Sequence, residues 1–474
     1  MKKLILIFFI LISQSIYAGN FEQFIYYVNL LPLNERQAKV DSFMNANPIL
    51  PYIQDDTAVF FIYQGNAQSL EIAGDFTNWA PSMPMTGVFG TNFYYSSAHY
   101  EADARLDYKF IIDGNWILDP KNPYTCTGGM GTNSELRMPA YIVPPEISFY
   151  SNIPHGIIRD TSFYSNNLNN TRLVKIYLPP GYSVQKQYPV IVFHDGLEYV
   201  SLANTKNIFD YLISHHEIEP VIGVFVPPVD RQNEYAGTKK DAFTAFIVNE
   251  LMPVIDQKYA TSKDPRKRAT LGASDGGNIA LYLGMKHPET FGKIAAQSSD
   301  VQTDISTTFQ NSAKMNLEFY MDIGTYDIPI LIPMVNNFIQ ILQNKNYVYQ
   351  FKQWHEGHSW GNWKAHLSLA LRQFFPPETG LNEIIIPDKI RLYQNFPNPF
   401  KTTTRINFNI PGSSQVELTV YDASGKIVQT LCKGMLFTEN NSISFTNPDL
   451  AGGVYFYSLR VDQYLLSKKM NICN

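Results

Sequence analysis

The sequence predicts an α/β central domain flanked by two small all-β, immunoglobulin-like sandwiches. Between about residues 155 and 375, short apolar runs such as PVIVFHDG and RATLGAS alternate with helical stretches, the pattern of βαβ units and a mainly parallel sheet. Residues 58–145 and the segment from 389 onward instead alternate apolar and polar residues, as antiparallel strands do. At 474 residues, the chain is long enough for about three domains.

The composition excludes several classes of protein. Hydrophobic residues make up 45% and charged residues 17%, which excludes a disordered chain. The net charge is −5 and no basic stripe is present, so a nucleic-acid partner is not expected. Three cysteines (Cys126, Cys432 and Cys473) form no disulfide framework and fit no zinc spacing, so no metal site is expected.

The N-terminus predicts export. Residues 1–18 combine two lysines, the apolar run LILIFFILI and a small-residue end, with cleavage expected between Ala18 and Gly19. No later apolar run reaches the ~18 residues of a membrane helix, so no integral membrane segment is expected in the mature chain. Residues 19–50 show helical spacing interrupted at Pro32, and no chemistry is assigned to them.

Ser274 is the candidate nucleophile. It stands at the centre of a G-x-S-x-G pattern at residues 272–276, after the strand RATL and before the helix that begins at Gly276. A strand-to-helix turn with small flanking residues exposes the serine hydroxyl at the carboxyl edge of a sheet. The pattern alone is weak evidence, and an inert serine in a glycine-rich turn is the alternative.

The histidine and carboxylate candidates follow later strands. His358 lies after the last predicted strand and before the last helix, where a doubly wound hydrolase places its base. Asp327 lies in the loop after the preceding strand, whereas Asp322, the alternative acid, falls within that strand. The carboxylate is needed to orient the histidine and to stabilise its protonated form. The order Ser274, Asp327, His358 is that of an α/β-hydrolase.

An oxyanion hole is expected from backbone amides. The first donor is the N–H of Asp275, directly after the candidate nucleophile, and the second is the N–H of Gly196 or Leu197, after the strand PVIVFHDG. Such donors stabilise the negative charge that develops on the carbonyl oxygen during acyl transfer.

A set of stretches spans about 220 residues of the central region: IYLPPGY, PVIVFHDG, Arg231, Glu234, ATLGASDGGNIALYLGMKHPETFGKIAAQSS, GTYD and EGHSWGNWKAHLSLAL. In these stretches the region resembles the esterase family that includes esterase D, enterochelin esterases and the feruloyl or acetylxylan esterases of carbohydrate esterase family 1. The resemblance implies ester hydrolysis by a serine without a cofactor, with Ser274, Asp327 and His358 at the family's triad positions. It does not imply the substrate.

Residues 73–79 (AGDFTNW) and 108–116 (YKFIIDGNW) resemble early-set modules of the glycogen-binding type. In sugar-binding members of that group, two tryptophans stack on pyranose rings while a lysine and an asparagine bind hydroxyls. Trp79, Trp116, Lys109 and Asn133 match those positions. Many such modules fused to enzymes bind no sugar and only shape the rim of the active site, and this alternative stays open.

The C-terminal residues resemble the sorting domain of proteins exported by type IX secretion, through the motif NFPNPF at 395–400, the turn DASGK and the run GGVYFYSL. Type IX secretion machinery is therefore an expected partner, and the expected location is secreted or at the cell surface. The predicted organisation is a signal peptide (1–18), a helical segment (19–50), an early-set sandwich (51–147), an α/β-hydrolase domain (152–378), a linker (379–388) and a sorting sandwich (389–474).

Three functions compete on the sequence alone. The leading expectation is a secreted serine esterase that acts on feruloylated or acetylated polysaccharide. The second is an enterochelin-type esterase that opens siderophore lactones; these enzymes also carry an N-terminal early-set domain, but export across the outer membrane argues against this reading. The third is a catalytically silent, carbohydrate-binding surface protein, which an intact triad disfavours.

Overall fold

The computed structural model describes residues 21–377, 390–410, 414–436, 440–446, 450–461 and 464–473. The predicted signal peptide (1–18) and the predicted linker (379–388) lie outside these residues. The chain divides after Pro377 into two compact units, which are described separately. Within the described part of the chain, no helix has both the length and the apolar character needed to span a membrane.

The first unit begins with two helices on either side of Pro32, α2 (Phe21–Leu30) and α3 (Leu33–Ala46). Their apolar faces pack on the first sheet of the N-terminal sandwich, where the rings of Phe21 and Phe60 lie 4.3 Å apart. The helical segment thus contributes to the core of the sandwich, because its aromatic residues fall at helical spacing on one face.

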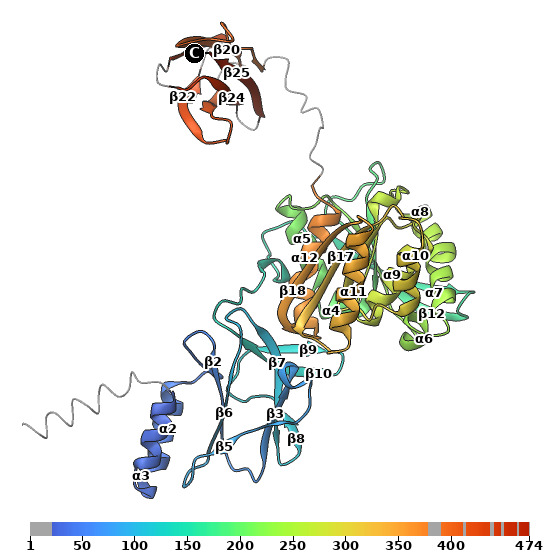
Figure 1. The fold of residues 1–474 in the computed structure, drawn as a ribbon. Coiled ribbons are helices and arrows are strands. Elements are labelled where there is room, and N and C mark those ends of the chain that lie inside the picture. The colour runs from blue at the N-terminus through green and yellow to red at the C-terminus, as the bar shows by residue number, and fades with distance from the viewer. Residues whose placement is uncertain are drawn as a thin grey trace, which may run out of the picture. The chain divides into compact units, whose positions relative to one another are not determined.

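Two antiparallel sheets form the N-terminal sandwich (Figure 1). The first runs in the order β1 (Tyr52–Gln54), β2 (Ala58–Gln64), β6 (Phe93–His99), β5 (Thr86–Gly87). The second contains β3 (Leu70–Gly74), β4 (Met83–Pro84), β7 (Arg105–Ile112), β8 (Asn115–Ile117), β9 (Thr125–Gly128) and β10 (Gly131–Arg137). Alternate apolar residues of both sheets share one core, as the two-residue period of the sequence predicts.

The central domain is built on a mostly parallel sheet. Its strands follow the order β11 (Ile157–Ser165), β12 (Asn170–Leu178), β14 (Ile222–Val226), β13 (Val190–His194), β15 (Arg268–Ala273), β16 (Lys293–Gln297), β17 (Glu318–Tyr326), β18 (Val348–Gly357). The first two strands pair antiparallel, and those from β14 to β18 are parallel to one another. The predicted α/β class is confirmed.

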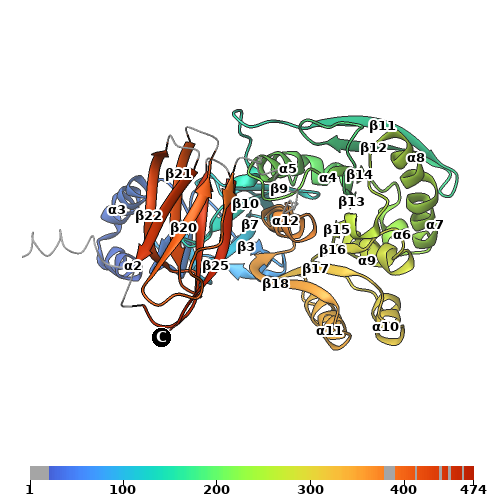
Figure 2. The same ribbon diagram turned by 90° about the horizontal axis from the view of Figure 1, so that it is seen from above.

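Helices cover both faces of this sheet (Figure 2). One face carries α4 (Gly196–Ser201), α5 (Thr205–Ser214) and α12 (Trp360–Phe374). The other carries α6 (Arg231–Tyr235), α7 (Lys240–Ala245), the π-helical turn Phe246–Leu251, α8 (Met252–Lys258), α9 (Asp275–Lys286), α10 (Thr303–Asn311) and α11 (Leu331–Asn344). Successive residues of a strand enter opposite cores, so fully apolar runs such as VIVF are explained by burial on both sides.

The central sheet continues into the N-terminal sandwich. Glu356 at the end of β18 pairs in parallel register with Arg105 at the start of β7, which joins the two domains through one sheet. The sequence patterns predict the sandwich and the hydrolase as separate domains, whereas in the structure both belong to one compact unit. This junction lies directly before His358.

The second unit is an all-β sandwich, as predicted. One sheet contains β19 (Arg391–Leu392), β20 (Thr403–Asn409) and β23 (Asn440–Thr446); the other runs β22 (Ile427–Leu436), β21 (Ser414–Tyr421), β24 (Gly453–Val461), β25 (Tyr464–Ile472). The two sheets enclose their own apolar core, to which Phe408, Leu418 and Leu459 contribute. The unit therefore has the core of an independent domain.

Candidate active site

Ser274 occupies a strained turn between β15 and α9. Its backbone angles are φ 58° and ψ −127°, a region that residues with side chains rarely adopt. The turn is tight enough that a Cβ on Gly272 would lie 2.1 Å from the carbonyl oxygen of Gly276. Glycine at position 272 is thus required by the close approach of the backbone, which is the geometry of a nucleophile elbow.

His358 and Asp327 are joined by a hydrogen bond of 2.7 Å between Nδ1 and Oδ1. Asp327 follows β17 and its side chain is fully buried, whereas the side chain of His358, after β18, is 19% exposed. The backbone N–H of Ile328 also donates to Oδ1 of Asp327, at 2.7 Å. A buried carboxylate with these partners stays in one orientation and holds the imidazole in place.

Asp322, the alternative acid, points elsewhere. It is fully buried in β17, where Oδ2 accepts hydrogen bonds from the Tyr320 hydroxyl at 3.0 Å and from Gln297 Nε2 at 3.3 Å. Burial raises the pKa of Asp322 to about 6. It makes no hydrogen bond to His358 within the described residues, so its contacts are those of a structural group.

The candidate nucleophile and the His358–Asp327 pair share one edge of the sheet. The strands that precede Ser274, Asp327 and His358 are all parallel, so the three residues leave the sheet at its carboxyl ends. Within the described chain, no hydrogen bond joins the Ser274 hydroxyl to His358. A serine hydroxyl reaches its base by rotation, and catalytic hydrogen bonds often tighten only when substrate is bound.

The predicted oxyanion donors lie at the N-termini of two helices, at the same carboxyl edge of the sheet. Gly196 and Leu197 begin α4, and Asp275 begins α9, so their backbone N–H groups have no partner within those helices. The strands before them, β13 and β15, are neighbours. A Cβ on Gly196 would come within 2.2 Å of Val226 N, so only glycine fits where the chain turns into α4.

Arg231 ties these two helix starts together. Its guanidinium forms a bidentate pair with Asp195, the residue before α4, at 2.8 and 2.9 Å. The remaining nitrogen donates to Asp275 at 2.8 Å. Glu234, the other polar residue of the same motif, instead pairs with buried Arg172 at 3.0 Å. One arginine thus connects the two loops that carry the candidate oxyanion donors.

Lys109, Trp116 and Asn133 lie on strands of one sheet of the sandwich, and Trp79 lies in the turn that follows β3. The indole rings of Trp79 and Trp116 are stacked with centroids 6.5 Å apart, and Trp116 is 46% exposed. Strand alternation places Lys109 on the same face as Trp116, because Trp116 pairs with Ile111. Asn133 donates to Asp107 at 3.3 Å, so its amide is already engaged.

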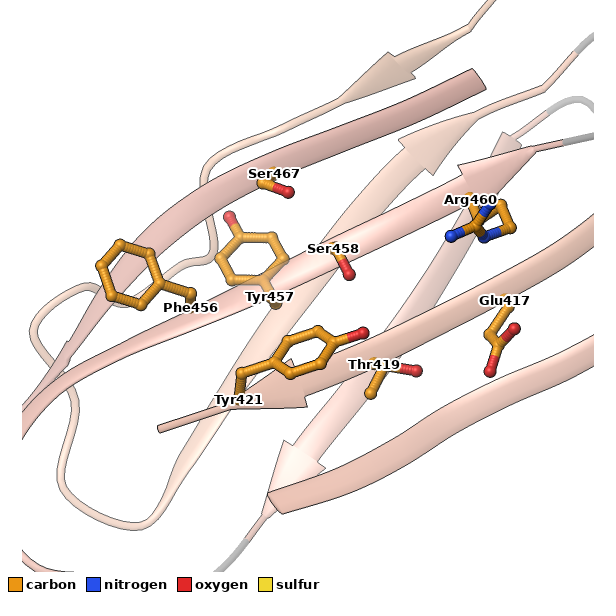
Figure 3. Close-up of a pocket in the computed structure, with 8 residues that line it drawn as sticks. All are labelled: Glu417, Thr419, Tyr421, Phe456, Tyr457, Ser458, Arg460 and Ser467. Atoms are coloured by element: carbon orange, nitrogen blue, oxygen red, sulfur yellow. The ribbon is translucent and has the colours of Figure 1, made fainter. Parts of the chain in front are cut away.

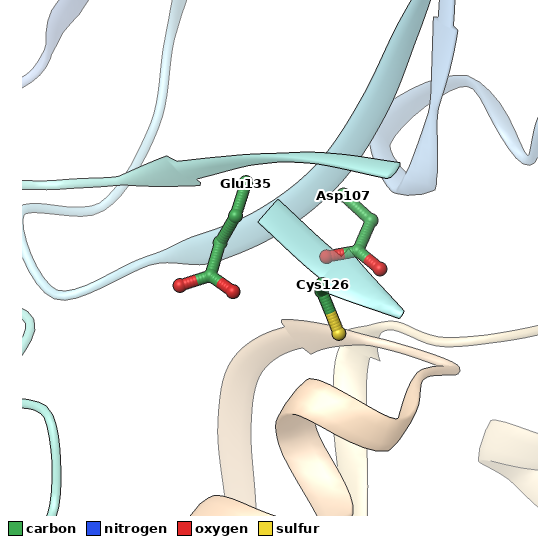
Figure 4. Close-up of side chains that lie close together, drawn as sticks. All are labelled: Asp107, Cys126 and Glu135. Carbon is green, nitrogen blue, oxygen red and sulfur yellow. The ribbon is translucent and has the colours of Figure 1, made fainter. Parts of the chain in front are cut away.

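Asp107, Cys126 and Glu135 bring three donor atoms within 4.8 Å of one another (Figure 4). Both carboxylates are bound by the guanidinium of Arg105, at 2.8 Å each, which already supplies the positive charge. Burial raises the pKa of the Cys126 thiol to about 11, so this sulfur is not a thiolate at neutral pH. Both carboxylates of this cluster are therefore already paired with a cation of the chain itself.

A pocket lies on one sheet of the second unit. It crosses β21, β24 and β25 and is lined by Glu417, Thr419, Tyr421, Phe456, Tyr457, Ser458, Arg460 and Ser467 (Figure 3). Glu417 and Arg460 are cross-strand neighbours in this sheet. No residue of the candidate active site belongs to this unit, so the pocket is a feature of the C-terminal sandwich alone.

Ser298, which hydrogen-bonds to Asp327, is not among the residues predicted from the sequence. Ser298, after β16, donates to Oδ2 of Asp327 at 2.6 Å and accepts from Trp363 Nε1 at 3.0 Å. The Trp363 ring also meets the His358 ring edge-on, at 5.0 Å between centroids. A signal was present, since Ser298 is a polar residue directly after a buried parallel strand, where functional side chains collect.

Family comparisons agree with this architecture. Residues 165–374 match the family described as "Putative esterase", and residues 394–473 match "Secretion system C-terminal sorting domain". Residues 57–136 match "Glycogen recognition site of AMP-activated protein kinase". Three parts of the chain thus match an esterase family, a glycogen-binding-like module and a secretion sorting domain, as the resemblances in the sequence predict.

Curated relatives match parts of the chain. An uncharacterized protein of Bacillus subtilis, YjcH, is 29% identical over 46% of this chain and 98% of its own length. An endo-1,4-beta-xylanase/feruloyl esterase of Xylanibacter ruminicola is 27% identical over 39% of this chain and 27% of its own. An iron(III) enterobactin esterase of Escherichia coli O6:H1 is 27% identical over 38% of this chain and 46% of its own.

Solved structures agree on the fold. The enterobactin esterase of Shigella flexneri superposes with a TM-score of 0.61 over 70% of this chain and 97% of its own, at 20% identity. At that identity the likeness supports the fold alone. The match to the esterase family is what supports a hydrolase.

Proposed function

From the esterase-family identity of the central domain, we propose that the protein is a secreted serine carboxylic-ester hydrolase with Ser274 as nucleophile. The observation that carries the proposal is the 2.7 Å hydrogen bond between His358 Nδ1 and buried Asp327. With Nδ1 donating to the carboxylate, Nε2 is left as the proton acceptor. The strained turn at Ser274 supports the assignment, because such strain is typical of nucleophile elbows.

The proposed reaction has two steps, acylation of Ser274 and hydrolysis of the acyl-serine. His358 Nε2 takes the hydroxyl proton as Ser274 Oγ attacks the acyl carbon, and the carbonyl electrons move onto oxygen, facing the N–H groups of Asp275 and of Gly196 or Leu197. When the carbonyl re-forms, the alcohol leaves with the proton from His358. Water then attacks the acyl-serine by the same route and releases the carboxylic acid and Ser274.

For the substrate we propose an acylated polysaccharide carrying feruloyl or acetyl esters. The similarity to a protein named as a feruloyl esterase supports this class. The sorting domain supports it as well, since a polysaccharide too large to enter the cell must be attacked outside it. Trp79 and Trp116, stacked and partly exposed, offer flat apolar faces to sugar rings, and Lys109 lies on the same face.

A siderophore-lactone esterase is the second candidate. Similarity to an iron(III) enterobactin esterase favours it, and the superposition on a solved enterobactin esterase covers 70% of this chain, more than the hydrolase domain alone. The two candidates use the same Ser274 chemistry and differ in the acyl group and in the alcohol. A catalytically silent carbohydrate-binding protein, the third candidate, differs from both because it hydrolyses no ester.

One experiment separates the candidates. The purified chain and its Ser274→Ala variant are assayed on p-nitrophenyl acetate, feruloylated and acetylated xylan, and enterobactin. We expect the wild type to release acid from the acylated xylans and Ser274→Ala to lose several orders of magnitude in turnover. Preferred turnover of enterobactin would select the second candidate. Xylan binding without hydrolysis of any ester would select the third.

The sugar-binding role of the module is tested separately. Trp116→Ala is compared with Tyr124→Ala, a similarly exposed aromatic residue of the same sandwich, 42% against 46% exposed. If Trp116 stacks on sugar, its loss lowers retention on insoluble xylan and raises KM for the polymer, while activity on p-nitrophenyl acetate is unchanged. Equal retention of both variants would leave the module without this role.

A further inference from the structure

Arg105 extends from the N-terminal sandwich to the residue that follows His358. Its side chain is 1% exposed, and its Nη1 donates to Ser359 Oγ at 3.1 Å. The same nitrogen lies 3.7 Å from Oε2 of Glu356, two residues before His358. A single guanidinium from another domain therefore contacts both sides of the loop that carries the candidate base.

The guanidinium is fixed on its own side by two carboxylates. Nη2 donates to Asp107 and to Glu135, at 2.8 Å each, and both acids are buried. The two acids come from neighbouring strands and lie close together (Figure 4). Against the hydrolase the packing is just as close, since a Cβ on Gly361 would lie 2.0 Å from the guanidinium carbon. The fork geometry of arginine, with donors in fixed directions, suits this bridging position.

The sandwich makes two further contacts with the chain next to the His358–Asp327 pair. The buried carboxylate of Asp75 packs on Gly357, where an added Cβ would lie 2.0 Å from it. Glu101 accepts a 2.8 Å hydrogen bond from the hydroxyl of Tyr326, the residue before Asp327. The sandwich thus touches the chain next to both His358 and Asp327.

We propose that Arg105 is a positioning residue for His358, so that the N-terminal sandwich completes the active site of the hydrolase. Arg105 does not touch the reacting atoms. It acts through Ser359, whose hydroxyl also caps α12 by accepting from Asn362 N–H. The residues on either side of His358 are therefore held to the helix start and to the sandwich together. This inference rests on the proposed ester hydrolysis at Ser274.

The test compares two acetate esters that differ only in their leaving group. p-Nitrophenol leaves as a stable anion, whereas p-methoxyphenol is a weaker acid and depends more on a proton from His358 as it departs. A misplaced histidine therefore lowers kcat/KM for p-methoxyphenyl acetate more than for p-nitrophenyl acetate. General acid catalysis contributes about 10²–10⁴-fold, so loss of part of it widens the ratio between the esters by about tenfold.

Arg105→Lys is the decisive variant. It keeps the positive charge among the buried acids, but one ammonium cannot span both carboxylates and Ser359 as the fork does. Arg137→Lys is the matched control, because Arg137 pairs with the same Glu135 and contacts neither Glu356 nor Ser359 within the described residues. We expect a widened ester ratio in Arg105→Lys and an unchanged ratio in Arg137→Lys.

Ser359→Gly removes the same contact from the hydrolase side. Because glycine is tolerated at helix N-caps, we expect this variant to fold even if Arg105→Lys does not. An unchanged ester ratio in folded Arg105→Lys, or in Ser359→Gly, would overturn the positioning role. Equal losses on both esters that follow only the folded fraction would also overturn it. Absence of hydrolysis in the wild type would instead refute the proposed function.

Discussion

Ser298 Oγ donates a 2.6 Å hydrogen bond to Oδ2 of Asp327, the carboxylate oxygen opposite the one that meets His358. The Ser298 hydroxyl in turn accepts from Trp363 Nε1 at 3.0 Å. All of these contacts lie at buried atoms apart from the partly exposed histidine. The orientation of the candidate acid is therefore set by a chain of directed hydrogen bonds from β16 and α12, not by burial alone.

We expect Ser298→Ala to lower kcat by roughly tenfold, a part of the ~10⁴ that loss of a triad carboxylate costs. The alanine leaves Oδ2 of Asp327 without this donor, so the carboxylate can rotate away from His358. Ser299→Ala is the control, because Ser299 is an equally buried neighbour whose hydroxyl has no hydrogen-bond partner among the described residues. Equal kcat values for the two variants would contradict the role of Ser298.

Asp327→Asn should lose a large part of the ~10⁴ factor in kcat, because an amide cannot stabilise the protonated histidine. Asp322→Asn should keep most of its turnover and change mainly stability, since Asp322 contacts Tyr320 and Gln297. Steady-state kinetics on p-nitrophenyl acetate with both folded variants decides between them. A severe loss in Asp322→Asn with a nearly unaffected Asp327→Asn would reverse the assignment.

The predictable parts of this molecule follow from local patterns. The period-two runs predicted the sandwiches, the fully apolar runs predicted strands buried on both faces, and the G-x-S-x-G turn marked where Ser274 stands. Arg105 could not be recognised in this way. It is one charged residue in an alternating strand, and its partner Ser359 lies 254 residues away, brought near only by the pairing of β7 with β18.

Asp300 predicts how stability depends on pH. Burial, followed by the neighbouring Asp275 carboxylate, raises the pKa of Asp300 from its ordinary value of 3.8 to about 7. Between these values the folded chain keeps the proton while the unfolded chain has lost it, so the free energy of unfolding falls as pH rises from about 4 to 7. This single group contributes a slope of at most about 1.4 kcal/mol per pH unit.

Asp300→Asn removes that titration, so its unfolding free energy should fall less steeply over the same window than that of the wild type. Urea unfolding of both proteins at pH 5 and pH 8 measures the difference. Asp230→Asn is a suitable control, because hydrogen bonds from Lys239 and Asn233 lower the pKa of that partly exposed carboxylate and it does not titrate in this window. Identical pH slopes in the wild type and Asp300→Asn would refute the assignment.

The C-terminal sandwich should be needed for export and not for catalysis. Its core, which includes Phe408, Leu418 and Leu459, is separate from the cores of the first unit, and no candidate catalytic residue lies within it. A chain ending at Pro377 should therefore keep the kcat/KM of the full protein on p-nitrophenyl acetate.

Because the sorting family matches residues 394–473, the same truncation should stop the protein in the periplasm of the producing cell. Activity assays on culture medium, cell surface and periplasm measure both effects. Truncated protein in the medium would refute the sorting role, and loss of activity in the purified truncation would show that the sandwich supports the active site.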